Sequence, residues 1–304
     1  MARLRKELLV CKMITVGIPT FNEERIIAKA ITSALSQISQ ADEVIVVASG
    51  CTDNTVSEIR QVMSADKRVR LITEAGRNGK SSALNLIIRN ARSDIVVQMD
   101  GDVELQEGAI KHLLSHFEDP QIGAVSGNPI PVISREHVFH DWTVMSYRRA
   151  GQLREQESKC GVFWHISGYL LAFRKKALPE VPFAKGAVDA WMGKIIQSNG
   201  YKIVYEPEAQ VLVKAPLTVR DFINQKARVR AGYYDLIRQT GKAPRTVQRE
   251  ISWLPRELMN VPLTAWPYFL FSGFVYLYSW MKGWYLSRTN ASLSKIWKIP
   301  VSTK

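Results

Sequence analysis

The stretch IVVQMDGD, residues 95–102, joins a short apolar run to two carboxylates that flank one glycine. The apolar run predicts a buried strand, and Asp100-Gly101-Asp102 then forms the tight turn at its end. Two carboxylates on one turn suit a hard divalent cation, Mg²⁺ or Mn²⁺, because a substrate's phosphates supply other ligands. The same three residues also make a good turn without any ligand. Motifs elsewhere in the chain are needed to distinguish a metal-binding turn from a turn without a ligand.

Further short β-rich runs lie at residues 14–18, 44–47, 69–72 and 123–125. The segments between the first four runs carry apolar residues at helical spacing, and Thr55 is placed to cap the second helix. Strands separated by single helices predict an α/β fold with a mostly parallel sheet covered on both faces. A ligand site then lies at the carboxyl ends of the strands, where the loops after Ile18, Val47 and Met99 come together.

The second half of the chain is less regular. It has a helix-like stretch at 137–157, a strand-like run at 169–173 and a helical pattern at 189–197. We interpret residues 133–240 as the acceptor-facing half of one domain, 1–240, whose nucleotide-binding half is 13–132.

Residues 241–304 have a different composition. Residues 246–259 mix charged and apolar side chains as an amphipathic helix at a membrane interface does. Val261 to Met281 is a run of 21 residues without a formal charge, long enough to span a bilayer, with aromatic residues toward both ends. We therefore expect a transmembrane segment at about 261–286. A re-entrant or surface-lying helix pair and a buried core helix remain as alternatives.

The net charge of +13 favours an anionic partner, which includes nucleotide phosphates, acidic lipid headgroups and nucleic acid. The three cysteines form no paired pattern, which fits a reducing compartment. Residues 1–12 are basic but lead into no signal region of adequate length, so we expect the N-terminus to stay in the cytoplasm.

Several motifs agree with the carboxylate turn. In chain order they are PTFNE at 19–23, Thr52-Asp53, Gly79-Lys80 followed by Ala83-Leu84-Asn85, and Asp100-Gly101-Asp102. In this order and spacing they resemble the nucleotide-binding half of family 2 glycosyltransferases, which are inverting enzymes of the GT-A fold. The match covers roughly residues 13–235. The expected fold is thus a Rossmann-like GT-A domain with a short C-terminal membrane-interface and transmembrane region.

The resemblance assigns roles to residues of the first half. It implies that the nucleotide-sugar is bound by Pro19, Thr20, Asn22, Glu23, Ser49, Asp53, Lys80 and Asp100, with Lys80 near the diphosphate. Asp100 and Asp102 would hold the metal. Many family members have paired Asp residues where this chain has Ala48 and Ser49, and the second of those usually contacts the base. Ser49 therefore weakens an inference of uracil and leaves guanine open.

Further roles fall in the second half. Asp189, in the sequence VDAW at 188–191, matches the family's catalytic base, although Val188 replaces the first member of an acidic pair. Without the resemblance, Asp189 reads equally well as a helix N-cap.

Gln225 and Arg228 resemble the Gln-x-x-Arg-Trp motif of the cellulose-synthase-like membrane branch, where they face acceptor and diphosphate, but Val229 replaces the Trp. This puts an acceptor role at the motif in doubt. His165 lies in the segment of an acceptor-side loop and reads either as a site residue or as a packed polar residue.

Two other patterns are discounted. GRNGKS at 76–81 has two residues between its glycines where a P-loop needs four, and the Arg and Lys clusters lack the interleaved aromatics of an RNA-binding pattern. We expect no nucleic-acid partner.

The favoured function is an inverting, metal-dependent, non-processive transfer of one sugar to a polyprenyl- or dolichyl-linked glycan at the cytoplasmic face of the cell membrane. Archaeal and bacterial mannosyl- and glucosyltransferases of lipid-linked glycan assembly resemble this layout, and GDP-mannose is the leading donor. The alternatives are a UDP-sugar-dependent transferase of polysaccharide synthesis and a non-catalytic basic module that binds nucleotide or RNA.

Overall fold

The computed structural model describes residues 13–184, 186–241, 252, 254–259 and 261–289. These residues divide into two compact units. The first contains the chain up to Ile130 together with Arg154–Phe183 and Met192–Val213. The second contains Pro131–Leu153, Ala184–Trp191 and the chain from Lys214 onward. The predicted boundary at residue 240 remains a prediction.

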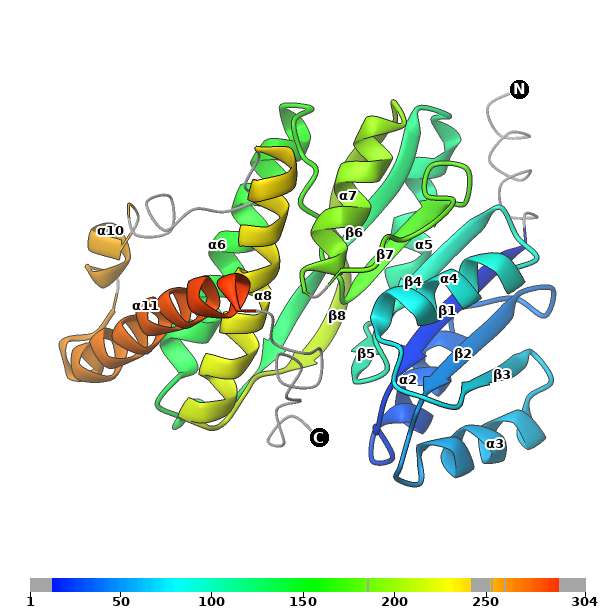
Figure 1. The fold of residues 1–304 in the computed structure, drawn as a ribbon, viewed down its shortest axis with the longest axis horizontal. Coiled ribbons are helices and arrows are strands. Elements are labelled where there is room, and N and C mark those ends of the chain that lie inside the picture. Colours follow the sequence, from blue (N-terminus) through cyan, green and yellow to red (C-terminus); the bar gives the residue numbers. More distant parts are fainter. Residues whose placement is uncertain (1–12, 185, 242–251, 253, 260, 290–304) are drawn as a thin grey trace. The chain divides into compact units, whose positions relative to one another are not determined.

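One eight-stranded sheet forms the core of the first unit (Figure 1). Its strands are β1 (Ile14–Thr20), β2 (Glu43–Ser49), β3 (Val69–Glu74), β4 (Ile95–Met99), β5 (Val103–Leu105), β6 (Ile122–Val132), β7 (Leu170–Arg174) and β8 (Lys202–Lys214). They lie in the order β3-β2-β1-β4-β7-β6-β8-β5. The first four in this order are parallel, so their carboxyl ends share one edge, as the sequence predicted.

Helices follow most of these strands. They are α2 (Ile27–Leu35), α3 (Thr55–Ala65), α4 (Lys80–Asn90), α5 (Ala109–Leu114) with the 3₁₀ turn Ser115–Glu118, and most of α7 (Val188–Ser198). Every residue of β1, β2 and β4 is buried, because both faces of these strands are covered. Val16 and Ile18 pack with α2, whereas the intervening Gly17 faces Ile87 of α4, where a Cβ atom would come within 2.4 Å of the Ile87 methyl.

The other half of the sheet differs from the mostly parallel arrangement predicted. β7 pairs antiparallel with β4, β6 with β7, and β5 with β8. Thr55 is also the first residue of α3 rather than its cap; Asn54 holds the cap position and makes no side-chain capping hydrogen bond.

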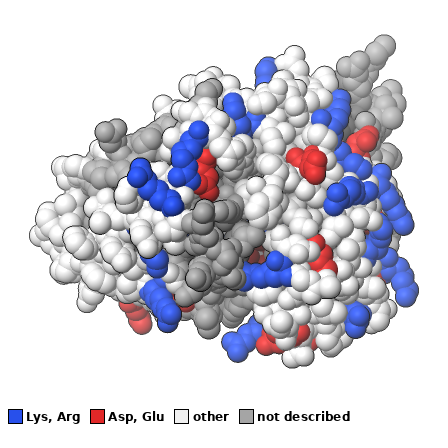
Figure 2. Space-filling view, viewed as in Figure 1, with Lys and Arg blue, Asp and Glu red and all other residues white. Residues whose placement is uncertain are grey.

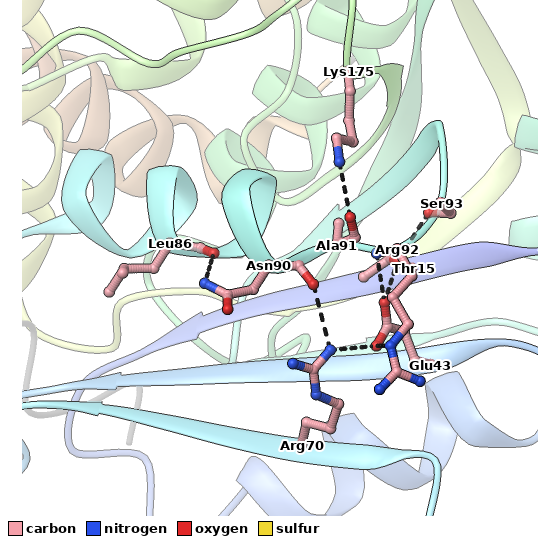
Figure 3. A network of polar contacts seen from close by, with 9 residues as sticks. All are labelled: Thr15, Glu43, Arg70, Leu86, Asn90, Ala91, Arg92, Ser93 and Lys175. Carbon is pink, nitrogen blue, oxygen red and sulfur yellow. Dashed lines mark hydrogen bonds and ion pairs between the residues drawn. The ribbon is translucent and has the colours of Figure 1, made fainter.

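A buried carboxylate joins the amino-terminal ends of the parallel strands. Glu43, the first residue of β2, accepts hydrogen bonds from Thr15 Oγ1 at 2.9 Å, Arg70 Nη1 at 2.7 Å and the Arg92 backbone N–H at 2.9 Å (Figure 3). Ser93 Oγ in turn donates to Thr15 Oγ1 at 2.8 Å. Burial by itself raises the pKa of Glu43, but these donors outweigh it and hold the pKa below its ordinary value of 4.5.

Replacing Glu43 with Gln is expected to lower the free energy of unfolding at pH 7 by about 2 kcal/mol, because hydrogen bonds to a charged group are lost inside the sheet. A lowered pKa means that the stabilisation is present above pH 4.5 and is lost as the pH falls through the folded-state pKa. Urea unfolding at pH 7 and pH 4 should therefore show the difference between Gln variant and native protein shrinking at the lower pH. Glu118→Gln, at an exposed position, is the control; an equal effect of both changes would contradict this role.

The second unit is helical. It contains most of α6 (His140–Lys159), the start of α7, α8 (Val219–Thr240), α10 (Leu254–Leu258), a 3₁₀ turn (Leu263–Ala265) and α11 (Trp266–Arg288). α8 and α11 pack against each other, and aromatic side chains from α6, α8 and α11 form a buried cluster. Gly283 of α11 lies so close to α8 that a Cβ atom would come within 2.9 Å of the Ala227 carbonyl oxygen.

α11 occupies most of the predicted transmembrane segment, and Pro267 lies in its first turn, where proline does not interrupt a helix. Among the described residues, no helix combines the length and the apolar character needed to cross a bilayer, so the structure does not support the spanning segment. One side of α11 is buried against protein. Other apolar side chains of the same helix are exposed, among them Leu270, Phe274 and Met281. Of the predicted amphipathic helix at 246–259, the structure describes residues 252 and 254–259, which include the short helix α10. The N-terminal residues 1–12 lie outside the described residues.

Candidate active site

The loops after β1 and β2 are bound to each other. Asn22 Nδ2 donates to Thr52 Oγ1 at 2.9 Å, and the Thr52 backbone N–H donates to Asn22 Oδ1 at 2.8 Å. The Glu23 backbone N–H donates to Thr55 Oγ1 at 2.7 Å. Asn22 has φ of 54°, a left-handed conformation that asparagine tolerates better than most residues. The predicted nucleoside-binding residues of these two loops thus lie together at the carboxyl edge of the sheet.

Asp53 has a structural role in this loop pair. One of its carboxylate oxygens accepts from the Thr55 backbone N–H at 3.0 Å and from Thr55 Oγ1 at 2.6 Å. The other accepts from the Glu24 backbone N–H at 3.3 Å. Because the carboxylate fixes both loops, it shapes the site, and contact with a nucleoside remains a prediction.

The carboxylate turn lies beside the end of β1. A Cβ atom on Gly101 would come within 2.7 Å of Thr20 Oγ1, so only glycine fits between Asp100 and Asp102. Thr20 Oγ1 is itself buried and has no hydrogen-bond partner among the residues that the structure describes. A buried hydroxyl without a partner beside this turn is an oxygen that a bound ligand can use.

Lys80, the first residue of α4, reaches across to this turn. Its ammonium forms an ion pair with Asp100 Oδ1 and donates to the Gly168 carbonyl oxygen at 2.9 Å. Gln98 Nε2 donates to the same two acceptors, at 3.2 Å to Asp100 Oδ1 and 2.8 Å to Gly168. The segment that contains His165 therefore contributes the carbonyl of Gly168, whereas the His165 side chain is buried, with its ring 6.4 Å from that of Trp164.

The residues of this turn fit a divalent cation of the kind predicted. Across the described ranges, no three His, Cys, Asp or Glu side chains gather into a metal site of their own. Mg²⁺ and Mn²⁺ bound with a diphosphate need only one or two carboxylates, since phosphate oxygens and water complete the shell. Asp100 and Asp102 can supply these carboxylates, provided that the Lys80 ammonium leaves Asp100.

Replacing Lys80 with Ala is accordingly expected to tighten Mn²⁺ binding in the absence of nucleotide by about tenfold, because the competing cation is removed. Nucleoside diphosphate binding should weaken by a similar factor, because the displaced ammonium no longer meets the phosphates. Electron paramagnetic resonance of free Mn²⁺ and calorimetry with GDP and UDP measure the two effects. Lys111→Ala, at an exposed position, is the control; unchanged Mn²⁺ affinity in Lys80→Ala would refute the competition.

Asp189 belongs to the second unit. It lies in the first turn of α7, after Val188 begins the helix, so the alternative that it is the N-cap is wrong. Ala187, two residues earlier, has φ of 48°, a strained conformation for a non-glycine residue of the kind found at functional sites. A Cβ atom on Gly232 of α8 would come within 2.7 Å of the Ala187 Cβ atom, so glycine is required there.

Gln225 and Arg228 lie three residues apart on α8, on one face of the helix. The start of α7 is close to them, since a Cβ atom on Gly186 would come within 2.7 Å of the Arg228 carbonyl oxygen. Two residues further on, Arg230 is buried, with its guanidinium 4.2 Å from the centre of the Trp280 ring. The second unit therefore brings the predicted base and the Gln-x-x-Arg residues onto neighbouring segments.

Sequence reasoning missed Gln98 and Gly168. Gln98 is a fully buried polar residue inside the apolar run of β4, and that interruption is the signal that could have drawn attention to it. The carbonyl of Gly168 carries no such signal.

The glycosyl transferase family 2 model matches residues 15–181, more than half of the chain. The chain belongs to glycosyl transferase family 2. Its α/β fold is that of the GT-A nucleotide-sugar transferases. A mannosyltransferase from Pyrobaculum calidifontis, in complex with GDP-Man and Mn²⁺, superposes with a TM-score of 0.62 at 24% identity, over 93% of this chain and 77% of that protein.

Two curated members of family 2 are also similar in sequence. The poly-beta-1,6-N-acetyl-D-glucosamine synthase of Staphylococcus aureus strain COL is 25% identical over 232 residues, and the synthase of the same name from Staphylococcus epidermidis is 25% identical over 225 residues. These matches cover 74% and 71% of this chain but 55% and 53% of the relatives. The chain thus spans about half the length of the curated relatives that it matches.

Proposed function

We propose that this protein transfers a single sugar from a nucleotide-sugar to an acceptor hydroxyl, with inversion and without processive elongation. The observation that carries the proposal is the turn of Asp100 and Asp102 at the end of β4, with the Lys80 ammonium placed at it. Carboxylates and an ammonium at the carboxyl edge of a parallel sheet suit a metal-bound diphosphate leaving group.

The chain's own residues have distinct tasks in this reaction. Asp189 removes the proton from the acceptor hydroxyl as its oxygen attacks the anomeric carbon. The bond to the diphosphate breaks on the opposite side of that carbon, which inverts its configuration. Lys80 and Arg228 compensate the charge on the departing diphosphate. A divalent cation held by Asp100 and Asp102 supplies further stabilisation of that charge.

GDP-mannose is the leading donor. The similar solved structure is a mannosyltransferase in complex with GDP-Man and Mn²⁺, which supports a guanosine donor and a divalent cation without deciding either. Ser49 supports the same choice, because its hydroxyl lies within 3.2 Å of the Asn78 backbone N–H and offers no negative charge to a uracil ring.

The proposed acceptor is a polyprenyl- or dolichyl-linked glycan at the cytoplasmic face of the cell membrane. Support comes from the exposed apolar face of α11, where Phe274 is 76% and Met281 68% exposed, because such a face suits shallow insertion among lipids. The net charge of +13 suits anionic headgroups. Figure 2 shows Lys and Arg spread over the visible face with Asp and Glu between them, which fits a general attraction better than one nucleic-acid track.

A second candidate is a UDP-sugar-dependent transferase of polysaccharide synthesis. Two relatives are named as synthases of an N-acetylglucosamine polymer, which favours this candidate.

The deciding experiment assays detergent-solubilised protein with UDP-glucose, UDP-N-acetylglucosamine and GDP-mannose, each with Mn²⁺, Mg²⁺ or EDTA and a polyprenyl-linked acceptor mixture. Metal-dependent turnover of GDP-mannose supports the proposal, and turnover of a UDP-sugar alone supports the second candidate. Absence of turnover with every donor, together with absence of nucleotide binding by calorimetry, refutes both. Nucleotide binding without turnover points to a non-catalytic module.

A further inference from the structure

A second carboxylate lies at the same edge of the sheet, away from the metal turn. Glu74 ends β3 and is the register partner of Ser49 at the end of β2. Along this edge the strand ends follow in the order β4, β1, β2, β3, so Glu74 lies about 14 Å from the Asp100 turn, at three strand spacings of ~4.8 Å. A donor with its diphosphate at Asp100 and its ribose over the loops of β1 and β2 places its base near β3.

The two oxygens of Glu74 have different surroundings. Oε1 accepts from Asn78 Nδ2 at 2.9 Å and from Ser82 Oγ at 2.6 Å. Oε2 is buried and has no hydrogen-bond partner within the described part of the chain. An acceptor in this state costs free energy unless a ligand completes its hydrogen bonds.

Glu74 is also kept ionised. Burial raises the pKa of its carboxyl group, but the hydrogen bonds from Ser82 and Asn78 outweigh burial and lower the pKa below its ordinary value of 4.5. At neutral pH the group therefore only accepts hydrogen bonds.

The neighbouring loops offer a surface on which a flat ring can stack. The Arg77 guanidinium lies 4.2 Å from the centre of the Phe21 ring, which joins the loop after β3 to the loop after β1. Aromatic and guanidinium planes of this kind are the usual stacking partners of bases. Asn78 is exposed. A bound base can therefore replace the Asn78 amide as a hydrogen-bond donor to Glu74, and water then solvates that amide.

We propose that Glu74 reads the base of the donor and selects guanine. Guanine presents two adjacent donors, N1–H and the N2 amino group, which match the two oxygens of one carboxylate. Uracil presents a single N–H donor, N3–H, so it can complete the hydrogen bonds of only one of these two oxygens. This inference rests on the proposed function and adds to it the residue that sets base specificity.

The test measures GDP, IDP and UDP binding by calorimetry with Mn²⁺ present, because IDP lacks only the 2-amino group of GDP. The native protein is expected to bind GDP about 10- to 100-fold more tightly than IDP, the usual loss for a hydrogen bond to a charged group. UDP should bind more weakly than GDP. In Glu74→Gln, where an amide NH₂ replaces one acceptor, GDP binding should weaken by a similar factor and the ratio of GDP to IDP affinity should approach one.

Ser82→Ala is the matched control, because it removes a partner of Oε1 and leaves the carboxylate in place; the ratio of GDP to IDP affinity should stay as in the native protein. If the native protein binds GDP, IDP and UDP with the same affinity, the inference is overturned and the proposed function stays intact. This measurement uses the native protein alone, so it does not depend on the folding of any variant. An unchanged GDP to IDP ratio in a folded Glu74→Gln protein also overturns it. Absence of binding by all three nucleotides removes the proposed function and this inference together.

Discussion

Replacing Asp189 with Asn is expected to reduce turnover by about 10²–10⁴-fold, the usual contribution of a general base, while nucleotide affinity stays unchanged. The amide keeps the size of the side chain but cannot take a proton from the acceptor hydroxyl. The position of Asp189 in the first turn of α7, after the strained Ala187, supports this role. Turnover measured by product formation and GDP or UDP affinity measured by calorimetry separate chemistry from binding.

Asp141→Asn is the matched control for this change, because Asp141 also lies in the first turn of a helix, α6, in the same unit. Its turnover should match that of the native protein. Native turnover in Asp189→Asn would exclude Asp189 as the base and leave the search for that group open on α8.

A comparable loss, about 10³-fold, is expected for Asp102→Asn, because a metal at a leaving group contributes several kcal/mol to transition-state stabilisation. Asp102 is a cleaner choice than Asp100, since neutralising Asp100 also removes the partner of Lys80. Retention of Mn²⁺ in the presence of GDP, measured by electron paramagnetic resonance, should fall together with turnover. Asp94→Asn, an exposed position just before the same strand, is the control; full Mn²⁺ retention by Asp102→Asn would exclude Asp102 as a ligand.

Strands β1, β2 and β4 were predictable because each is buried on both faces and is therefore rich in apolar residues. β8 was missed because it is buried on alternate residues and carries Pro207 and two Glu residues. β5 has three residues and exists as a strand through its pairing with Val211–Val213 of β8, more than a hundred residues later. Local sequence cannot reveal a pairing of that separation.

The candidate site shows the same division. Motifs identified the loops and the carboxylate turn, because loop chemistry is local. The contacts between side chains were not predictable: Lys80 and Asp100 are twenty residues apart, and the pairing depends on where α4 begins. Glu74 was not recognised, because a Glu at the end of a strand resembles any solvated surface residue until its buried oxygen is known.

The structure does not support the transmembrane prediction at α11, and sequence alone could not have decided it. An uncharged aromatic segment reads in the same way whether lipid or protein covers it. Ser272, Ser279 and Gly283 lie on the buried face of α11 and, being small, permit close packing against other helices. Their spacing was the available signal that one side of this segment contacts protein.

The ion pair of Lys80 and Asp100 also bears on how the domain reaches its folded state. Structural metal centres assemble carboxylates or thiolates that repel one another until the ion arrives, so their domains unfold when the ion is chelated. In this protein an ammonium already neutralises one of the two acidic groups on the turn. On the proposed function, the fold would therefore not depend on the cation, which would enter and leave with each nucleotide while the architecture persisted between turnovers.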